Sequence, residues 1–568
     1  MFMGTGASEG IALGKALMIE NEPLNIEKKE IEDVQKEKNK LLEALEASKE
    51  QLTKVKEKAS KELGADKAAI FEAHLMILDD PELMQNSINK IEEEKVNAEF
   101  AFKEVADQFI TIFESMDNEY MRERAADIKD VSDRVLRNIV GQKVIDLSML
   151  DEEVILIADD LTPSDTATMD KEKVLGFLTN IGGRTSHTAI MARSLEIPAV
   201  VGLKDITEKV NTGDFIVLNG ETGEVIVNPT EEEIKKYEGL KEQYEKNKKE
   251  LEEIIGKDSI TIDGREVELV GNIGTPKDIA GLKKNDAEGV GLYRTEFIYM
   301  DRDSMPTEEE QFNSYKEVLE SLNPKPVVIR TLDIGGDKKL PYLKIDEEMN
   351  PFLGYRAIRL CLDQKEIFKT QLRALLRASV YGNLKIMFPM ISSLEELLEA
   401  KKVLDGVKSD LDKEGIKYAD NIEVGMMIEV PSAAIISDVL AKHVDFFSIG
   451  TNDLIQYTTA VDRMNEKIHN LYNPFNPAVL RLIKMVIDNG HKENIWVGMC
   501  GEAAGDKRMI PILLGMGLDE FSMSASSILP ARRIIRSLKL EDTKKIANEV
   551  LNMSTAEEIE KYIKNIIK

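Results

Sequence analysis

The stretch Asp445-Phe446-Phe447-Ser448-Ile449-Gly450-Thr451-Asn452-Asp453 decides the fold of the C-terminal half of this chain. It begins with a short apolar run, which is typical of a strand buried in a parallel sheet, and it ends in polar residues. Similar runs recur from about residue 259 onward, separated by segments with helical periodicity. Together the runs are Val267–Val270, Gly289–Tyr293, Val327–Ile329, Ile386–Phe388, Val424–Ile428, Phe446–Ile449, Trp496–Met499 and Glu520–Ser522.

Eight strands alternating with helices over roughly 300 residues predict a (β/α)8 barrel. A doubly wound open sheet is the alternative arrangement of the same elements. The number of strands favours the barrel. The position of the polar residues favours it too, because barrel enzymes build their active sites at the C-terminal ends of the strands.

Charged and polar residues follow most of these strands. The ends of the runs, or the loops just beyond them, carry Asn272, Arg294, Glu296, Arg330, Asp333, Arg356, Glu429, Asn452, Asp453, Arg463, Cys500 and Glu502. Surface salt bridges are the alternative explanation in a chain with 32% charged residues. Repeated placement at strand ends favours a binding site instead, since random surface charge has no reason to follow the strands.

The side chains at this predicted mouth suit a small anionic substrate. Arginine forks bind carboxylate and phosphate oxygens in pairs. Glu429 and Asp453 are hard oxygen ligands suited to Mg²⁺, which also bridges substrate phosphates. Cys500, with an ordinary thiol pKa of about 8.5, would be protonated at neutral pH and able to donate a proton, although a small buried side chain is the alternative role. An anion with a carboxylate, a phosphate and a carbon that accepts a proton describes phosphoenolpyruvate.

The segment Gly182-Gly183-Arg184-Thr185-Ser186-His187-Thr188-Ala189-Ile190-Met191-Ala192-Arg193 marks a second site in the N-terminal half. It predicts a loop that turns into a helix, with His187 in the first turn. Unpaired N–H groups and the positive end of the helix dipole favour phosphate there, so His187 could carry a phosphoryl group. A capped helix with a surface histidine is the alternative.

The residues around this segment predict a small α/β domain with a helical insertion. A first strand over Ile11–Ile19 is followed by helical patterns between about residues 25 and 145, and short strands resume at Val154–Ala158. Thr230 and Glu233 form a capping box that begins a charged helix, either a linker or an ordinary peripheral helix. The predicted domains are 1–22 with 146–228 (α/β), 23–145 (helical insertion), 229–258 (linker helix) and 259–568 (barrel).

Composition excludes several functional classes. The net charge of −29 argues against a nucleic-acid-binding protein and could attract a basic protein partner. No apolar run is long enough to cross a bilayer, and the N-terminus lacks the pattern of a signal peptide. Two distant cysteines, Cys361 and Cys500, suit a reducing compartment, so we expect a cytoplasmic protein.

Five segments together resemble one known family: Gly182–Arg193, Gly289–Phe297, Arg330–Lys338, Asp445–Asp453 and Gly498–Glu502. The chain resembles enzyme I of the bacterial phosphoenolpyruvate:sugar phosphotransferase system, and the resemblance covers essentially the whole chain. The pyruvate dikinases also combine a phosphohistidine with a barrel, but they need an ATP-binding domain, for which the sequence offers no segment. A non-catalytic docking protein would be expected to have lost part of the histidine, arginine and carboxylate set, which is intact.

The resemblance implies a role for each matching residue. His187 would be the phosphorylated nucleophile, Thr166 would hydrogen-bond its ring, and Cys500 would protonate the departing enolate. Phosphoenolpyruvate would be bound by Arg294, Arg330, Arg356, Arg463, Asn452 and Lys338, and Mg²⁺ by Glu429 and Asp453. The resemblance further implies that the histidine phosphocarrier protein HPr docks on the helical insertion, and that the barrel forms a homodimer. Since His187 and the barrel lie in different domains, we expect a rigid-body movement about the linker.

Overall fold

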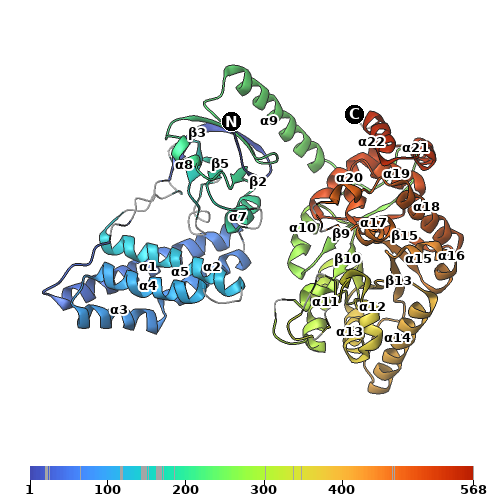
Figure 1. Ribbon diagram of the computed structural model, residues 1–568, viewed down its shortest axis with the longest axis horizontal. Helices are drawn as coiled ribbons and strands as arrows, with labels where there is room; N and C mark the ends of the chain where they lie inside the picture. The colour runs from blue at the N-terminus through green and yellow to red at the C-terminus, as the bar shows by residue number, and fades with distance from the viewer. Residues whose placement is uncertain are drawn as a thin grey trace. The chain divides into compact units, whose positions relative to one another are not determined.

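The computed structural model describes residues 1–566 except 20–23, 25, 64, 115–118, 143–146, 148–149, 151, 162–168, 171, 184–185, 301, 337, 339, 344, 347, 464 and 466. It consists of two compact units, Met1–Lys248 and Lys249–Lys568. Figure 1 shows the elements of each unit.

The N-terminal unit is built on an eight-stranded open sheet in the order β1-β8-β7-β3-β4-β5-β6-β2. Strands β3, β4, β5 and β6 run parallel in that order, and the other pairings are antiparallel. Apolar residues on the two faces of the sheet form separate core clusters. The strands are β1 (Phe2–Met3), β2 (Thr5–Ser8), β3 (Ile11–Met18), β4 (Val154–Ala158), β5 (Val174–Thr179), β6 (Ala199–Val201), β7 (Phe215–Asn219) and β8 (Glu224–Val227).

Five helices are inserted between the neighbouring strands β3 and β4. They share their own apolar core, in which Leu41, Phe71, Phe102 and Val135 are buried. This cluster is separate from the core of the sheet because the helices turn their apolar faces toward one another. The helices are α1 (Val34–Leu63), α2 (Ala65–Leu78), α3 (Pro81–Glu94), α4 (Ala98–Glu114) and α5 (Glu119–Val140).

Among the described residues, the helices that follow in this part of the chain are α7 (His187–Leu195), α8 (Ile206–Lys209) and α9 (Glu231–Glu252). The capping box that begins α9 is confirmed, since Thr230 N donates to Glu233 Oε2 at 2.8 Å and Glu233 N donates to Thr230 Oγ1 at 3.3 Å. Tyr237 anchors the first half of α9 by packing on the sheet, and its hydroxyl donates to Glu224 at 3.1 Å.

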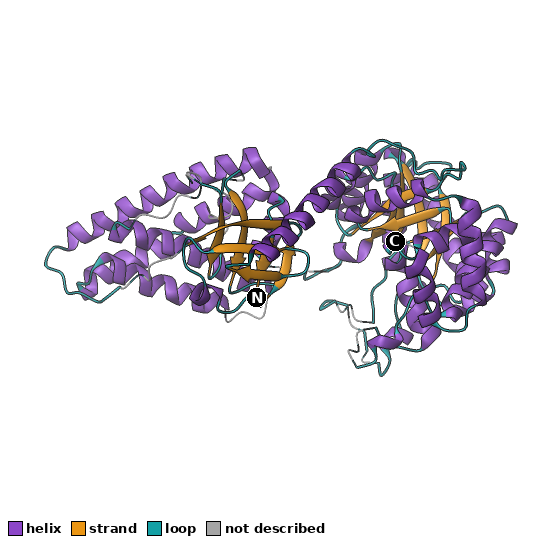
Figure 2. Ribbon diagram, turned by 90° about the horizontal axis from the view of Figure 1, so that it is seen from above, coloured by secondary structure: helices purple, strands orange, loops and turns teal. Residues whose placement is uncertain are grey.

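The C-terminal unit is a closed barrel of eight parallel strands, in which β16 pairs with β9. Closure confirms the barrel and rules out the open sheet. Figure 2 shows these strands enclosed by helices. The strands are β9 (Glu268–Ile273), β10 (Val290–Arg294), β11 (Pro326–Arg330), β12 (Asn383–Phe388), β13 (Glu423–Ile428), β14 (Phe446–Ile449), β15 (Trp496–Met499) and β16 (Glu520–Met523).

Helices cover the outside of the barrel and supply most of its large apolar core. They are α10 (Ile279–Lys284), α11 (Glu308–Leu322), α12 (Ile358–Asp363), α13 (Lys365–Ala378), α14 (Leu394–Glu414), α15 (Pro431–Ile435), α16 (Ser437–Leu440), α17 (Thr451–Thr459), α18 (Pro477–Lys492), α19 (Ile510–Met516), α20 (Ala525–Ser537), α21 (Leu540–Asn552) and α22 (Ala556–Ile566). Among the described residues, none of the helices combines the length and the apolar composition that a bilayer span requires.

Candidate active site

A cavity of about 1140 Å³ opens at the C-terminal ends of the barrel strands. Every barrel residue predicted for the site lines it, although these residues come from strands and loops spread over more than 200 positions. They are Arg294, Arg330, Lys338, Arg356, Glu429, Asn452, Asp453, Arg463 and Cys500. The structure therefore brings together in one cavity the residues that the strand-end pattern placed there, and Lys338, which only the family resemblance implied. We call this cavity the barrel mouth.

Two buried carboxylates hold the basic side chains of the barrel mouth in place. Glu296 Oε1 lies 2.7 Å from Arg330 Nη2 and 2.6 Å from Lys338 Nζ. Asp333 Oδ2 lies 2.9 Å from Arg330 Nη1, and its Oδ1 lies 2.9 Å from Arg356 Nη2. The sequence placed both carboxylates at strand ends but gave them no separate role. Their role here is to orient the basic groups.

The charge balance of this network keeps both acids ionised. Burial alone would raise the pKa of Asp333, but Arg330 and Arg356 outweigh it and hold that pKa well below its ordinary value. The pKa of Glu296 is lowered in the same way, against its burial, by Arg330 and Lys338. Buried charges of this kind persist only when they are paired, because an unpaired ion in the interior is costly. The basic groups are thus already oriented before any anion arrives.

The remaining substrate-binding candidates are more accessible. Arg294 is exposed, and its guanidinium lies 5.8 Å from the centre of the Phe297 ring. Arg463 Nη1 lies 3.8 Å from Asp453 Oδ1. Asn452 Oδ1 accepts a hydrogen bond from Glu502 N at 3.2 Å, which fixes this side chain at the rim. These residues add adjustable donors around the rigid pair Arg330 and Arg356.

Glu429 and Asp453 have the properties expected of ligands for a divalent cation. Both are buried, and Asp453 Oδ1 has no hydrogen-bond partner among the described residues. Burial and the nearby Asp453 raise the pKa of Glu429 well above its ordinary value. A cation between these carboxylates would relieve their repulsion, and Mg²⁺ commonly uses one or two protein carboxylates together with water and phosphate oxygens. The pair therefore fits Mg²⁺.

Cys500 lies at the base of the barrel mouth, just after β15. Its side chain is buried beside Met427 and Leu292, and Sγ lies 3.9 Å from Ile449 O. Burial raises the pKa of the Cys500 thiol to about 12. The thiol is consequently protonated at neutral pH, which is the state that a proton donor needs and a nucleophile does not.

The segment with His187 forms the predicted loop and helix start. Ser186 is the N-cap of α7, and its hydroxyl accepts a hydrogen bond from Ala189 N at 3.3 Å. His187 is the first residue of α7, while its side chain lies outside what the structure describes. Thr166 lies outside the described residues as well. Gly182 has φ of 116°, a left-handed conformation that glycine adopts at low cost as the loop turns.

Sequence reasoning gave no role to Thr188 and Tyr457, which hydrogen-bond to neighbouring residues at the two candidate sites. Thr188 is buried, and its hydroxyl lies 3.0 Å from Asp160 Oδ1, which ties the start of α7 to the end of β4. In the barrel mouth, Arg356 Nη1 donates to the Tyr457 hydroxyl at 3.1 Å. Neither residue stands at a strand end, so the rule that identified the other site residues gave no signal for them.

Comparisons with known proteins show the family to which the chain is related. Three families match: the N-terminal domain of PEP-utilising enzymes over residues 3–124, their mobile domain over 150–223 and their PEP-binding domain over 248–540. The phosphoenolpyruvate-protein phosphotransferase of Staphylococcus carnosus (strain TM300) is 58% identical over 566 residues, covering 99% of both chains. That of Staphylococcus aureus (strain MSSA476) is 57% identical over 569 residues, covering 100% of both. That of Bacillus subtilis (strain 168) is 58% identical over 565 residues, covering 100% of this chain and 99% of its own.

Proposed function

The chain belongs to the phosphoenolpyruvate-protein phosphotransferase family, and from that premise we propose that it moves the phosphoryl group of phosphoenolpyruvate first onto His187 and then onto HPr. The observation that carries the proposal is the barrel mouth itself. Oriented guanidinium groups, a carboxylate pair that fits Mg²⁺ and a protonated thiol all line one cavity. This combination suits an anion whose carbon must receive a proton.

In the proposed binding step, the guanidinium groups of Arg330 and Arg356 donate hydrogen bonds to the phosphate and carboxylate oxygens of phosphoenolpyruvate. Their pairing with Asp333 fixes the direction of their N–H groups, so little freedom is lost when the substrate arrives. Arg294, Arg463, Asn452 and Lys338 complete the ring of donors. Bound at Glu429 and Asp453, Mg²⁺ would neutralise phosphate charge.

In the proposed chemical step, a ring nitrogen of neutral His187 attacks phosphorus in line with the enol oxygen. The bond from nitrogen to phosphorus forms as the bond from phosphorus to the enol oxygen breaks, and the oxygen keeps the electron pair. The enolate then takes the proton of the Cys500 thiol at its terminal carbon and becomes pyruvate. The thiolate regains a proton from water. Since His187 and the arginines belong to different units, we expect the linker to let these units approach each other.

The second transfer, to HPr, is proposed to use the inserted helices. On α2, Met76 is 67% exposed, and the exposed Glu72 lies one helical turn away. Glu72 Oε1 lies 3.4 Å from Lys56 Nζ, so the proposal rests on Met76, an exposed apolar side chain on the inserted helices to which the family resemblance assigns HPr docking. In a Met76→Glu variant we expect phosphorylation by phosphoenolpyruvate to persist while transfer to HPr falls at least tenfold.

A homodimer through the barrel and a cytoplasmic location complete the proposal. The packed helices α15, α16 and α18 expose Ile435, Val439 and Met485, an apolar surface that a second barrel could cover. Both cysteines are free, which suits a reducing compartment.

The test is incubation of the full chain with Mg²⁺ and phosphoenolpyruvate carrying labelled phosphate. We expect a protein-bound label that is lost in acid and stable in base, and the release of one pyruvate for each label bound. His187→Ala should abolish it, whereas His443→Ala, a histidine outside both candidate sites, should retain it. Label that persists in His187→Ala would overturn the proposed nucleophile.

A further inference from the structure

A second cavity, of about 580 Å³, lies at the opposite end of the barrel, where the strands begin. We call it the floor cavity. It is lined by the first residues of β9, β15 and β16, namely Glu268, Trp496 and Glu520. The segment before β9 adds Asp258, Ser259, Arg265, Glu266 and Val267. The proposed phosphoryl transfer uses none of these residues.

The apolar interior of the barrel separates the floor cavity from the barrel mouth. Phe446 stacks on Trp496 with the ring centres 4.4 Å apart and the planes at 7°. Phe446 also belongs to the buried cluster that includes Val328, Met387 and Cys500. A ligand in the floor cavity would therefore not compete for space with phosphoenolpyruvate.

The wall of the floor cavity is strongly acidic. Among the residues that the structure describes there, carboxyl groups outnumber cationic groups by six to two. Both cations are already paired: Arg265 Nη2 lies 2.5 Å from Asp519 Oδ1, and Lys385 Nζ lies 3.1 Å from Glu423 Oε2. Arg532 Nη2 also lies 3.6 Å from Glu288 Oε1, and Glu520 keeps its proton at neutral pH, so the excess negative charge of the floor cavity comes from Asp258, Glu266 and Glu268.

One of these carboxyl groups is buried and lacks a partner. Glu520 is 2% exposed, and its Oε1 has no hydrogen-bond partner among the described residues. Glu268 lies directly beside it, because Glu520 on β16 is in register with Glu268 on β9. In the described part of the chain, Glu268 likewise has no ion pair or side-chain hydrogen bond. A buried acceptor without a donor is costly, so this site is prepared for a donor from outside the chain.

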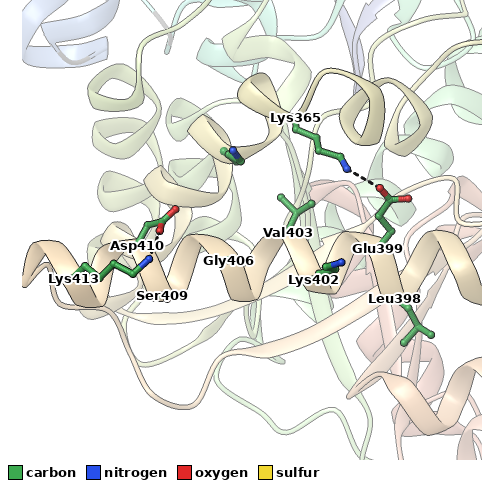
Figure 3. Close-up of a pocket in the computed structure, with 10 residues that line it drawn as sticks. Lys365, Leu398, Glu399, Lys402, Val403, Gly406, Ser409, Asp410 and Lys413 are labelled. Carbon is green, nitrogen blue, oxygen red and sulfur yellow. Dashed lines mark hydrogen bonds and ion pairs between the residues drawn. The ribbon is translucent and has the colours of Figure 1, made fainter.

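A groove elsewhere on the barrel differs from the floor cavity because its acidic residues are paired within the chain. The groove between α13 and α14, of about 650 Å³, is lined by Lys365, Glu399, Asp410 and Lys413 among others (Figure 3). Its acids are satisfied within the chain, since Lys365 Nζ lies 2.8 Å from Glu399 Oε1 and Lys413 Nζ lies 3.0 Å from Asp410 Oδ1. Among the described residues that line this groove, no buried acceptor lacks a partner, so Glu399 can serve as a control.

The chemistry of the missing donor follows from these observations. The excess negative charge calls for a cation. A cation that carries N–H groups satisfies both the charge and the orphaned acceptor.

We propose that the floor cavity binds a small organic cation, an alkylammonium or guanidinium group, whose N–H groups donate to Glu520 and Glu268. Trp496 reports on the occupant. It is the chain's single tryptophan, it lines the cavity, and its indole N–H donates to Glu423 Oε2 at 2.8 Å.

The experiment is a titration of Trp496 emission in the full chain with methylguanidinium and with 1,4-diaminobutane. Sodium chloride at equal ionic strength and tetramethylammonium, a cation without N–H groups, are the reference titrations. We expect a saturable change with at least one of the two probes and none with the references. Glu520→Gln should raise the midpoint at least tenfold, and Glu399→Gln, in the groove of Figure 3, should leave it unchanged.

A second variant guards against a folding defect in Glu520→Gln. Glu268 is exposed, so Glu268→Gln is expected to fold normally and still to weaken the midpoint severalfold. An emission change that tetramethylammonium reproduces, or a midpoint that neither glutamine variant moves, overturns the proposal. Phosphorylation by phosphoenolpyruvate, measured in the same samples, tests the barrel mouth independently of the floor cavity.

Discussion

The Asp333 carboxylate holds the Arg356 guanidinium inside the barrel mouth, with Nη2 2.9 Å from Oδ1 and 3.2 Å from Oδ2. Both side chains are buried. Arg356 therefore depends on Asp333 for its orientation, and a site that works by positioning charge is sensitive to the loss of that anchor.

Replacing Asp333 with asparagine should lower kcat/KM for phosphoenolpyruvate, although Asp333 acts through the arginines and does not contact the substrate in the proposed binding step. The variant keeps the shape of the side chain but removes the charge that pairs with Arg330 and Arg356. We expect kcat/KM for phosphoenolpyruvate to fall about 100-fold, an effect of the size seen when an oriented charge-stabilising donor is lost. Asp506→Asn, which lines the same cavity, is the control. Equal activities of the two variants would contradict a positioning role for Asp333.

Removing the Cys500 thiol should separate proton transfer from substrate binding. In Cys500→Ala we expect the Kd for phosphoenolpyruvate to stay within about twofold while kcat for pyruvate formation falls about 100-fold or more, the usual worth of a positioned acid. Cys361→Ala, which removes the other buried thiol, should keep the wild-type kcat. A Cys500→Ala enzyme with unchanged kcat would remove the thiol from the mechanism.

Neutralising either carboxylate of the proposed Mg²⁺ pair should weaken the metal. For Glu429→Gln and Asp453→Asn we expect the Mg²⁺ concentration for half-maximal activity to rise at least tenfold, since each variant removes a charged ligand. Binding of Mn²⁺, followed by electron paramagnetic resonance without substrate, should weaken in parallel. Glu502→Gln, also in the barrel mouth, is the control. Unchanged Mn²⁺ binding in both variants would place the metal elsewhere.

Glu520 should make the barrel less stable as the pH rises. Burial and the neighbouring Glu268 raise the pKa of Glu520 from 4.5 to about 8. Between these values the unfolded chain loses the proton while the folded chain keeps it, so the free energy of unfolding falls with increasing pH.

Glutamine at position 520 cannot ionise and removes this loss. The melting temperature of Glu520→Gln relative to wild type, read from Trp496 emission, should therefore rise between pH 5 and pH 8.5, by at least about 2 °C. It should level off above pH 8. Glu399→Gln should show no such trend. A difference that is the same at both pH values would mean that Glu520 ionises equally in both states.

An acidic residue on the apolar helix surface should disrupt the proposed dimer. Ile435 is 60% exposed on α15, and burial of such a side chain contributes to an interface that a carboxylate would oppose. We expect Ile435→Glu to shift sedimentation toward the monomer at concentrations where wild type is dimeric. Leu398→Glu, an exposed leucine on α14, should leave the distribution as it is. A dimer that tolerates Ile435→Glu would exclude this surface.

The barrel could be predicted from the sequence because most residues of its strands are buried, and most of the strands contain a short apolar run. The predicted run Phe446–Ile449 and strand β14 have the same bounds. The end of β9 was placed too early, at Val270 in place of Ile273. The reason is that Asn272 lies within the strand, where its amide bonds to Cys500 O and Ser522. A polar residue satisfied by neighbouring strands looks like a loop in the sequence.

The strands β1, β2 and β8 of the N-terminal unit could not be predicted. Strands β1, β2 and β8 are short and gain their pairing from segments far along the chain, as when Phe2 pairs with Val225. In the barrel mouth, the strand-end rule found the charged residues but not their partners. Arg330 lies 2.7 Å from Glu296 and 2.9 Å from Asp333, whereas Asp453 lies 3.3 Å from Arg356 and Glu429 accepts a hydrogen bond from Met390 N. These differences depend on distances that no sequence spacing encodes.

The barrel and the open sheet of the N-terminal unit differ in their edge strands, and this difference limits how the chain can associate. The barrel is closed and has no edge. The open sheet ends in β1 and β2, strands of only two and four residues. Among the described strands there is thus no long row of free main-chain groups that another polypeptide could extend. Recognition of any partner must rest on side chains displayed by helices and loops, and such recognition can be altered by point substitution without rebuilding a sheet.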